Sequence, residues 1–175
     1  MNLPSVIIVM GVSGAGKTAV GACLAKRLGW EFIEGDRLHP PANVAKMASG
    51  QPLDDADRAP WLAAIARAID DVRGRRGHAV LACSALKKSY RDIIIGDRAD
   101  VRLVYLKGSR ARIAERLKGR RGHFMPPGLL DSQFATLEPP AAAERAIIAA
   151  VAPPIADIVA QILAALQADP AQQGR

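Results

Sequence analysis

Eight consecutive residues near the start of the sequence have the types and spacing of a phosphate-binding loop. They are Gly11, Val12, Ser13, Gly14, Ala15, Gly16, Lys17 and Thr18, and they match the pattern G-x-x-x-x-G-K-[ST]. In this pattern the glycines let the backbone approach phosphate closely, and successive N–H groups form a nest for an anion. Lys17 is expected to bridge the β- and γ-phosphates, and the Thr18 hydroxyl to ligate Mg²⁺. Residues 11–18 are therefore predicted to bind MgATP.

The surroundings of this loop favour phosphate binding over the alternative, a glycine-rich turn that binds nothing. An apolar run, residues 6–10, comes directly before the loop, and a helical stripe of Val20, Leu24 and Leu28 follows it. A strand before the loop and a helix after it are the context that the motif requires.

A second group with catalytic chemistry is the acidic pair in Glu34-Gly35-Asp36, which follows a short apolar run. Asp36 is placed to accept the proton of an acceptor hydroxyl and to help hold Mg²⁺ through water. The alternative is a solvated acid at the end of a strand. Beside a phosphate-binding loop, we expect Asp36 to be catalytic.

The net charge of +7 is concentrated in one part of the chain. Residues 107–121 contain seven basic residues and one acid, so this window carries six of the seven net positive charges. A local cluster fits a compact polyanion better than a long nucleic-acid backbone. Aromatic residues make up only 4% of the chain, which leaves few stacking platforms for single strands. We therefore expect no nucleic-acid partner.

The arginines of this window are spaced for one face of a helix. Arg112, Arg116 and Arg120 recur every four residues, so a helix would align them and turn Ile113 and Leu117 to the core. Guanidinium groups suit phosphate oxygens, so Arg116 and Arg120 are predicted to close over the transferred phosphoryl group as part of a lid. A solvated basic helix face is the alternative.

A third apolar run, residues 79–83, is followed by a polar segment that ends at Arg91. Ser84, Lys87 and Arg91 are expected at the carboxyl end of the sheet, where ligands bind in open α/β folds. Lys87 and Arg91 are four residues apart and could meet an anionic substrate. A solvent-facing helix start is the alternative, and for Lys88 and Tyr90 the pattern favours the two interpretations about equally.

The elements that must position these residues follow from the alternation of short apolar runs with amphipathic stretches, which predicts βαβ units and a parallel sheet. We expect strands at residues 5–10, 31–33, 79–83, 101–106 and 147–151. Residues 39–61 and 118–140 are too long for ordinary connections, so they are predicted to be a substrate-binding insertion and a lid. Residues 167–175 are expected to form a flexible tail.

Length and composition set the remaining limits. A chain of 175 residues predicts a single domain, and 50% hydrophobic with 23% charged residues excludes wholesale disorder. Two cysteines, Cys23 and Cys83, favour reduced thiols over a disulfide scaffold. The most apolar stretch, residues 147–166, is interrupted by prolines and polar residues, and no targeting segment is visible, so we expect a cytoplasmic protein with no membrane partner.

The class of phosphate-binding protein can be narrowed. A GTPase would carry an Asn-Lys-x-Asp motif, but neither asparagine, Asn2 or Asn43, stands in one. A motor or large ATPase would need a longer chain. A small kinase that phosphorylates a small acceptor remains.

Several segments together resemble one family, the small P-loop gluconate kinases (gluconokinases of the thermoresistant type). The matching segments run in order at residues 10–18, 34–40, 46–54, 57–62, 83–91, 120–126 and 132–139. The loop is shared by many families. The segments Gly35-Asp36-x-x-His39-Pro40, Cys83-Ser84-Ala85-Leu86-Lys87 and His123-Phe124-Met125-Pro126 are far more particular.

The resemblance implies transfer of the γ-phosphoryl group of ATP to the 6-hydroxyl of D-gluconate, Mg²⁺ dependence and a homodimer. It also implies a five-stranded parallel sheet in the order 2-3-1-4-5, like that of nucleoside monophosphate kinases with a lid. The substrate carboxylate would explain Arg58, Lys87 and Arg91, and the polyol chain would explain His39, Ser84 and His123.

Two other functions stay open at this point. A shikimate kinase has a similar loop, but its Gly-Gly-Gly substrate motif has no counterpart here, since no two glycines are adjacent. A nucleotide- or RNA-binding module that uses the basic window would bind polynucleotides in a salt-sensitive manner.

Overall fold

The computed structural model describes residues 3–119 and 127–168 and contains a five-stranded sheet with the order β2-β3-β1-β4-β5. The strands are β1 (Val6–Met10), β2 (Glu31–Glu34), β3 (Ala79–Ala82), β4 (Val101–Lys107) and β5 (Ile147–Ala150). All neighbouring strands of this sheet are parallel. The predicted α/β class, the parallel sheet and its strand order are thereby confirmed.

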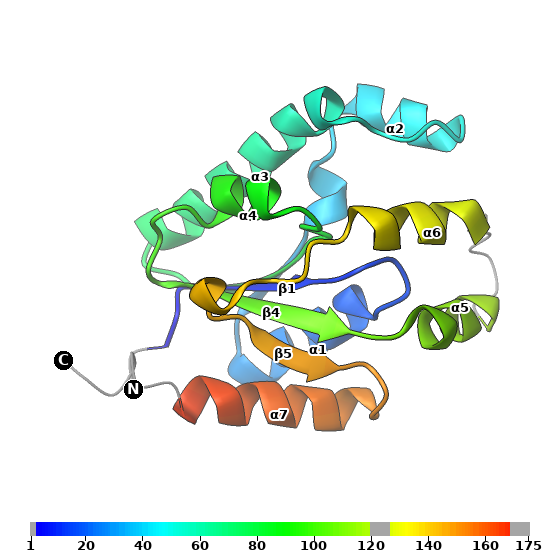
Figure 1. Ribbon diagram of the computed structural model, residues 1–175. Helices are drawn as coiled ribbons and strands as arrows, with labels where there is room; N and C mark the ends of the chain where they lie inside the picture. The colour runs from blue at the N-terminus through cyan, green and yellow to red at the C-terminus, as the bar shows by residue number, and fades with distance from the viewer. Residues whose placement is uncertain (1–2, 120–126, 169–175) are drawn as a thin grey trace.

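Helices cover both faces of the sheet, with α1 and α7 on one face and α3 and α4 on the other (Figure 1). The helices are α1 (Lys17–Leu28), α2 (Pro41–Ala48), α3 (Asp55–Gly74), α4 (Lys88–Ile94), α5 (Arg110–Lys118), α6 (Pro127–Thr136) and α7 (Ile155–Ala168). Two short 3₁₀ turns, η1 (Gly35–Leu38) and η2 (Ala142–Glu144), connect strands to helices.

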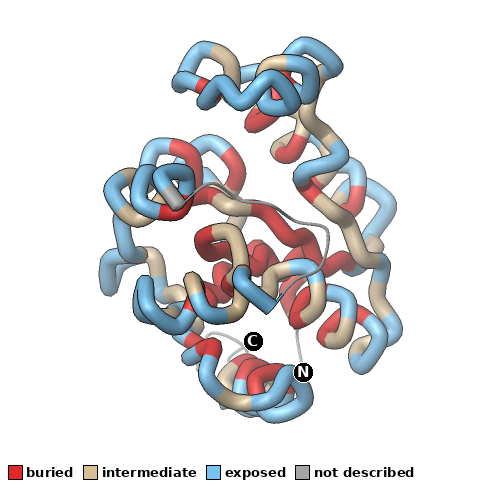
Figure 2. The backbone as a smooth tube through the Cα atoms, turned by 90° about the vertical axis from the view of Figure 1, so that its right-hand side faces the viewer, coloured by how far each residue is buried: buried red, intermediate tan, exposed pale blue. Residues whose placement is uncertain are grey.

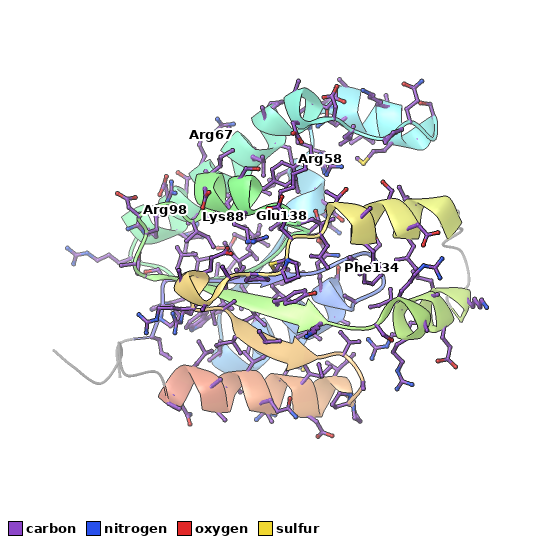
Figure 3. The ribbon with its side chains drawn as sticks, in the orientation of Figure 1. Arg58, Arg67, Lys88, Arg98, Phe134 and Glu138 are labelled. Carbon is purple, nitrogen blue, oxygen red and sulfur yellow. The ribbon has the colours of Figure 1, made fainter. Side chains whose placement is uncertain are left out.

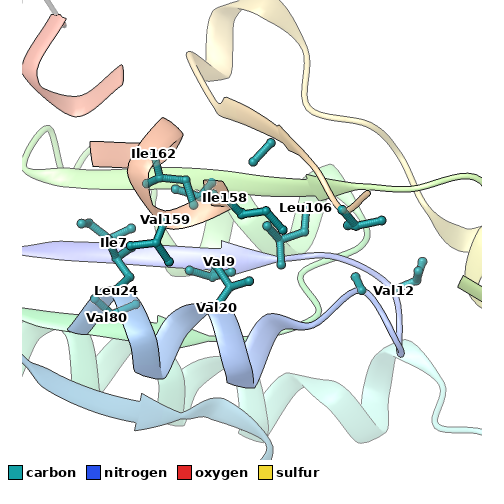
Figure 4. Close-up of a cluster of buried hydrophobic side chains, with 14 of the residues drawn as sticks. Ile7, Val9, Val12, Val20, Leu24, Val80, Leu106, Ile158, Val159 and Ile162 are labelled. Carbon is teal, nitrogen blue, oxygen red and sulfur yellow. The ribbon is translucent and has the colours of Figure 1, made fainter. Parts of the chain in front are cut away.

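The central strand β1 forms part of both cores because its side chains alternate between the two faces. Ile7 and Val9 pack with Leu24 of α1 and Ile158 of α7 in one cluster (Figure 4). Val6, Ile8 and Met10 belong to a second cluster with side chains of α3 and α4. Every residue of β1 is fully buried, as expected for a strand covered on both faces.

The strand register brings the carboxyl ends of the strands to one edge. Val9 of β1 is opposite Ala82 of β3 and Val104 of β4, and Ala82 is opposite Glu34 of β2. The segments that follow β1, β2 and β3 therefore start side by side. In Figure 1 the arrows of β4 and β5 point towards this edge, beside which α5 and α6 lie.

The two long segments contain helices that their composition did not indicate. Residues 39–61 contain α2 and the start of α3, and α2 forms a largely exposed projection in which Asn43 is the buried residue (Figure 2). Residues 118–140 contain α6. Of the predicted arginine stripe, Arg112 and Arg116 lie on α5, which ends at Lys118 with Gly119 as its C-cap. Arg120 and His123 lie outside the described residues, as does most of the predicted tail.

Within residues 3–119 and 127–168, no helix combines the length and apolar character that crossing a membrane requires.

Candidate active site

The phosphate-binding loop connects β1 to α1 in the way that the sequence predicts. Gly14 has a φ of 82°, and a Cβ atom there would lie 2.8 Å from the Leu117 Cγ of α5. Glycine is the one residue that adopts this left-handed conformation without strain and leaves room for the Leu117 side chain. The Lys17 Nζ donates to the Val12 carbonyl at 3.1 Å, across the loop. The loop thus lies at the N-terminus of α1, where backbone N–H groups and the helix dipole favour an anion.

The acidic pair lies next to this loop, with Glu34 in direct contact. The Thr18 hydroxyl donates to Glu34 Oε2 at 2.6 Å, whereas Asp36 lies on η1 and is exposed. Sequence reasoning assigned the metal to Thr18 and Asp36 and gave Glu34 no role. The spacing of two acids around Gly35 was the signal that could have included Glu34.

The turn that carries these acids is held tightly against the sheet. A Cβ atom on Gly35 would lie 2.5 Å from the Ala82 carbonyl oxygen, so no larger residue fits there. The Trp61 indole N–H of α3 donates to the Gly35 carbonyl at 2.9 Å. The backbone that carries Asp36 is therefore held at the carboxyl edge through its neighbour Gly35.

The donor set of this edge suits Mg²⁺. A hydroxyl from Thr18 and carboxylates from Glu34 and Asp36 are hard oxygen ligands. Among the described residues, no group of three or more His, Cys, Asp and Glu side chains is arranged to hold a metal. Mg²⁺ needs no such cage, because it keeps several waters and binds through one or two carboxylates plus substrate phosphates. The residues present fit this ion.

Cys83 lies behind the acidic turn and is fully buried. Burial, followed by the charge of Asp36, raises the pKa of its thiol to about 12. Cys83 is therefore a neutral thiol at neutral pH. Because only the thiolate is nucleophilic, we assign Cys83 a packing role beneath the acidic turn and no chemical one.

His39 is held by an aromatic ring and an amide. Its imidazole stacks on Trp61 with the ring centroids 4.3 Å apart. The Asn43 side-chain nitrogen donates to the Asp57 carbonyl at 2.8 Å and lies 3.3 Å from His39 Nδ1. Since that nitrogen can only donate, it favours the tautomer with the proton on Nε2. Burial lowers the pKa of His39. The negative charge of Asp36 opposes this shift, whereas the positive charge of Arg58 adds to it, and the resulting pKa lies below the ordinary value of 6.5. The ring is therefore mainly neutral at pH 7.

Arg58 and Lys87 both lie close to the ring of Tyr90. The Arg58 guanidinium carbon is 5.8 Å and the Lys87 ammonium 5.4 Å from the centroid of the Tyr90 ring. Asp55 accepts from Lys87 at 2.8 Å and from the Tyr90 hydroxyl at 2.5 Å. Figure 3 shows Arg58 near the start of α3, whereas Arg98 lies at the other end of this layer. Two predicted substrate residues are therefore brought to one place, where a carboxylate could be bound.

Arg91 has a different environment from the one predicted. Its side chain is 2% exposed and forms an ion pair with Glu144, at 2.5 Å and 3.0 Å. It also donates to the carbonyls of Ala85 and Leu86 at 3.0 Å and 3.2 Å. Ala85 has a φ of 44°, which is rare for a residue with a side chain. This geometry argues against the predicted substrate contact: Arg91 supports the turn that carries Ser84.

Arg116 lies against the backbone next to the phosphate-binding loop. It donates to the Ala15 carbonyl at 3.4 Å and to the Val151 carbonyl, in the segment between β5 and α7. Ile113 is buried and Leu117 packs against the same cluster, as the helical spacing predicts. The closure of Arg116 and Arg120 over a phosphoryl group remains a prediction.

Gln133 of α6 is a residue of this site that sequence reasoning missed. Its Oε1 accepts from the Ser13 backbone N–H at 2.7 Å, and its Nε2 donates to the Ser13 hydroxyl at 3.1 Å. The segment that contains Gln133 carried part of the family resemblance, but nothing in its local pattern pointed to the loop.

Comparison with known proteins identifies the family. The model of the shikimate kinase family matches residues 13–164. A gluconokinase from Gluconobacter oxydans (strain 621H) is 56% identical over 138 residues, which cover 78% of this chain and 77% of that protein. The chain belongs to the gluconokinase family. The thermoresistant gluconokinase of Escherichia coli (strain K12) is 43% identical, with 82% of each chain covered.

Solved structures agree with membership of the gluconokinase family. A gluconokinase from Sinorhizobium meliloti 1021 superimposes with a TM-score of 0.86 at 47% identity, covering 95% of this chain and 94% of that one. A shikimate kinase from Acinetobacter baumannii in complex with shikimate gives a TM-score of 0.60 at 20% identity. That likeness shows a common fold, and a shikimate kinase activity is less well supported.

Proposed function

We propose that this protein transfers the γ-phosphoryl group of MgATP to the 6-hydroxyl of D-gluconate, yielding 6-phospho-D-gluconate and ADP. The observation that carries the proposal is the identity with proteins named gluconokinase over most of the chain. The site adds a chemical reason, because the Thr18–Glu34 contact brings a phosphate-binding loop and an acidic turn to one edge of the sheet.

On the nucleotide side, backbone N–H groups where the loop enters α1, together with the Lys17 ammonium, hold the phosphates in place. Thr18, Glu34 and Asp36 would hold Mg²⁺, which when bound neutralises charge on the phosphate oxygens. Arg116 and Arg120 are proposed to stabilise the charge that develops on the transferred group.

On the acceptor side, Arg58 and Lys87 bind the gluconate carboxylate, and His39, Ser84 and His123 contact the polyol chain. Asp36 orients the 6-hydroxyl and accepts its proton. The bond from the hydroxyl oxygen to the γ-phosphorus forms while the bond from that phosphorus to the β–γ bridging oxygen breaks in line. Catalysis then rests mainly on positioning and electrostatics.

The decisive experiment measures ADP release by the purified protein with MgATP and a panel of acceptors. We expect turnover with D-gluconate and background rates with shikimate and nucleoside monophosphates. Lys17→Ala should nearly abolish turnover, whereas Lys26→Ala, at an exposed position in the last turn of α1, is the matched control. A background rate with D-gluconate would contradict the proposal.

We further propose that the protein is a cytoplasmic homodimer, as the family resemblance implies. Both cysteines are free, which favours a reducing compartment. Light scattering of the purified protein tests the oligomeric state.

A further inference from the structure

A side chain of α6 contacts the phosphate-binding loop from the opposite part of the chain. Gln133 and Ser13 are 120 positions apart and share two hydrogen bonds, one to the Ser13 N–H and one to its hydroxyl. An amide oxygen can only accept and an amide nitrogen can only donate, so Ser13 fixes which way the Gln133 amide faces. The contact is a specific two-point match.

The helix that carries Gln133 is anchored independently of this contact. Leu130 is 4% exposed, and with Phe134 it packs into the cluster that contains Val9 (Figure 3 shows Phe134 below α6). Asp131 forms an ion pair with Arg110 of α5. Gln133 therefore reaches the loop from a packed helix, which lowers the entropy lost when its side chain is held in one position.

We propose that Gln133 is a positioning residue for the phosphates of the nucleotide. It fixes Ser13 at the turn of the loop, so that the N–H groups that follow are oriented before ATP arrives. A loop that is ordered in advance binds more tightly because less conformational entropy is lost on binding. This inference rests on the proposed function, since it assigns Gln133 to the nucleotide side of that reaction.

The neutrality of Gln133 is a second part of the argument. A carboxylate at this position would accept from the Ser13 N–H at least as strongly as the amide does. It would also place a negative charge beside the loop that is proposed to hold a triphosphate. Gln133→Glu therefore keeps the bond to the loop and adds repulsion of the nucleotide, which separates a phosphate-positioning role from a purely structural one.

The test measures nucleotide binding directly, by calorimetric titration of the purified protein with MgADP in the absence of gluconate. We expect Gln133→Ala to raise the Kd about tenfold, the size of one or two lost hydrogen bonds. Gln133→Glu should raise it further, to about 30–100-fold, and its effect should shrink in high salt. The KM for gluconate should stay within about twofold in Gln133→Ala, because the change acts on the nucleotide side.

Two further variants control the experiment. Thr136→Ala removes a hydroxyl that donates within α6, to the Ser132 carbonyl, and should leave the Kd unchanged. Ser13→Ala removes the hydroxyl partner but keeps the backbone bond, so its effect should be smaller than that of Gln133→Ala. In the double variant, Ser13→Ala should add nothing to the loss from Gln133→Ala, because the shared bond is already absent.

Clear outcomes would overturn the inference. A wild-type Kd in Gln133→Ala, or nucleotide binding by Gln133→Glu as tight as in the wild type, would contradict it. So would a lower Tm combined with an unchanged Kd, since that is a structural effect. The proposed function fails separately: the wild-type protein would then bind no nucleotide, or would bind it without consuming ATP when gluconate is added.

Discussion

Two acids that are two residues apart have different surroundings in this protein. Glu34 accepts from the Thr18 hydroxyl and so belongs to the phosphate-binding loop. Asp36 is exposed on η1, in a turn that Gly35 holds against the sheet. In the proposed mechanism both acids help to hold Mg²⁺, and only Asp36 also serves as the general base for the acceptor hydroxyl.

Asp36→Asn tests this assignment. We expect kcat to fall by a factor of about 10²–10⁴, because a general base is lost, while nucleotide binding is retained. Steady-state kinetics with gluconate and calorimetry with MgADP give the two quantities. Asp71→Asn, at an exposed position on α3, is the matched control. A kcat close to that of the wild type would remove Asp36 from the mechanism.

Single residues also show where sequence reasoning reached its limit. Lys87 and Arg91 have the spacing of one helical face, so both were predicted to meet the substrate. Burial and a partner 53 positions away, Glu144, give Arg91 a different role. Gln133 could not be found from the sequence because its bond to Ser13 depends on how α6 packs, and no periodic pattern encodes that contact.

At the scale of elements, the Arg91–Glu144 pair links α4 to η2. The side chains are 2% and 13% exposed, so the pair is shielded from water. Removal of one partner leaves a buried charge, and Arg91→Ala should therefore lower the free energy of unfolding by about 3–5 kcal/mol. Urea denaturation measures this. Arg67→Ala, at an exposed position on α3, should change it by less than about 0.5 kcal/mol.

The same pair predicts how stability depends on pH. The hydrogen bond from Arg91 lowers the pKa of Glu144 below its ordinary value of 4.5. The contribution of the ionised Glu144 carboxylate to the free energy of unfolding is therefore complete above about pH 4.5. It is lost as the pH falls through the lowered pKa of Glu144 in the folded state. Urea denaturation between pH 7 and pH 3 should show a smaller loss on acidification in Glu144→Gln than in the wild type. Parallel pH profiles would contradict this assignment.

The elements themselves were predictable to different degrees. The five strands lie within a residue or two of the predicted runs. The continuous apolar runs β1 and β3 are buried throughout, as expected in a parallel sheet, whereas β2 and β5 are partly exposed. The helices α2 and α6 were not predicted, because their segments are rich in proline, glycine and polar residues. The end of α5 at Lys118 was not predicted, because the arginine spacing continues past Gly119, the C-cap of this helix.

At the scale of the whole molecule, the two cores share the three central strands of the sheet, β3, β1 and β4. Each of these strands supplies side chains to both clusters, so the two cores are built on the same strands. This arrangement supports the proposal that the chain is a single cooperative domain. The tryptophans report on both sides, since Trp61 is buried in one cluster and Trp30 packs against the other.

Leu24→Ala and Ile65→Ala test this cooperativity, one in each cluster. Each should lower the free energy of unfolding by about 2–5 kcal/mol, because each leaves a cavity in a packed core. In both variants, tryptophan fluorescence and circular dichroism should follow one coincident transition. Separate transitions for the two probes would mean that the layers unfold independently.

The buried thiol behind the acidic turn offers a way to observe motion. The thiolate is the form of cysteine that reacts with alkylating reagents, so the buried, neutral Cys83 should stay unmodified while the site is packed. Cys23, on α1, is partly accessible and would react. In a variant with Cys23 replaced, the alkylation rate of Cys83 would report how often the packing beneath the acidic turn opens. Slower alkylation of Cys83 in the presence of a nucleotide would then show that ligand binding makes local opening around this residue less frequent.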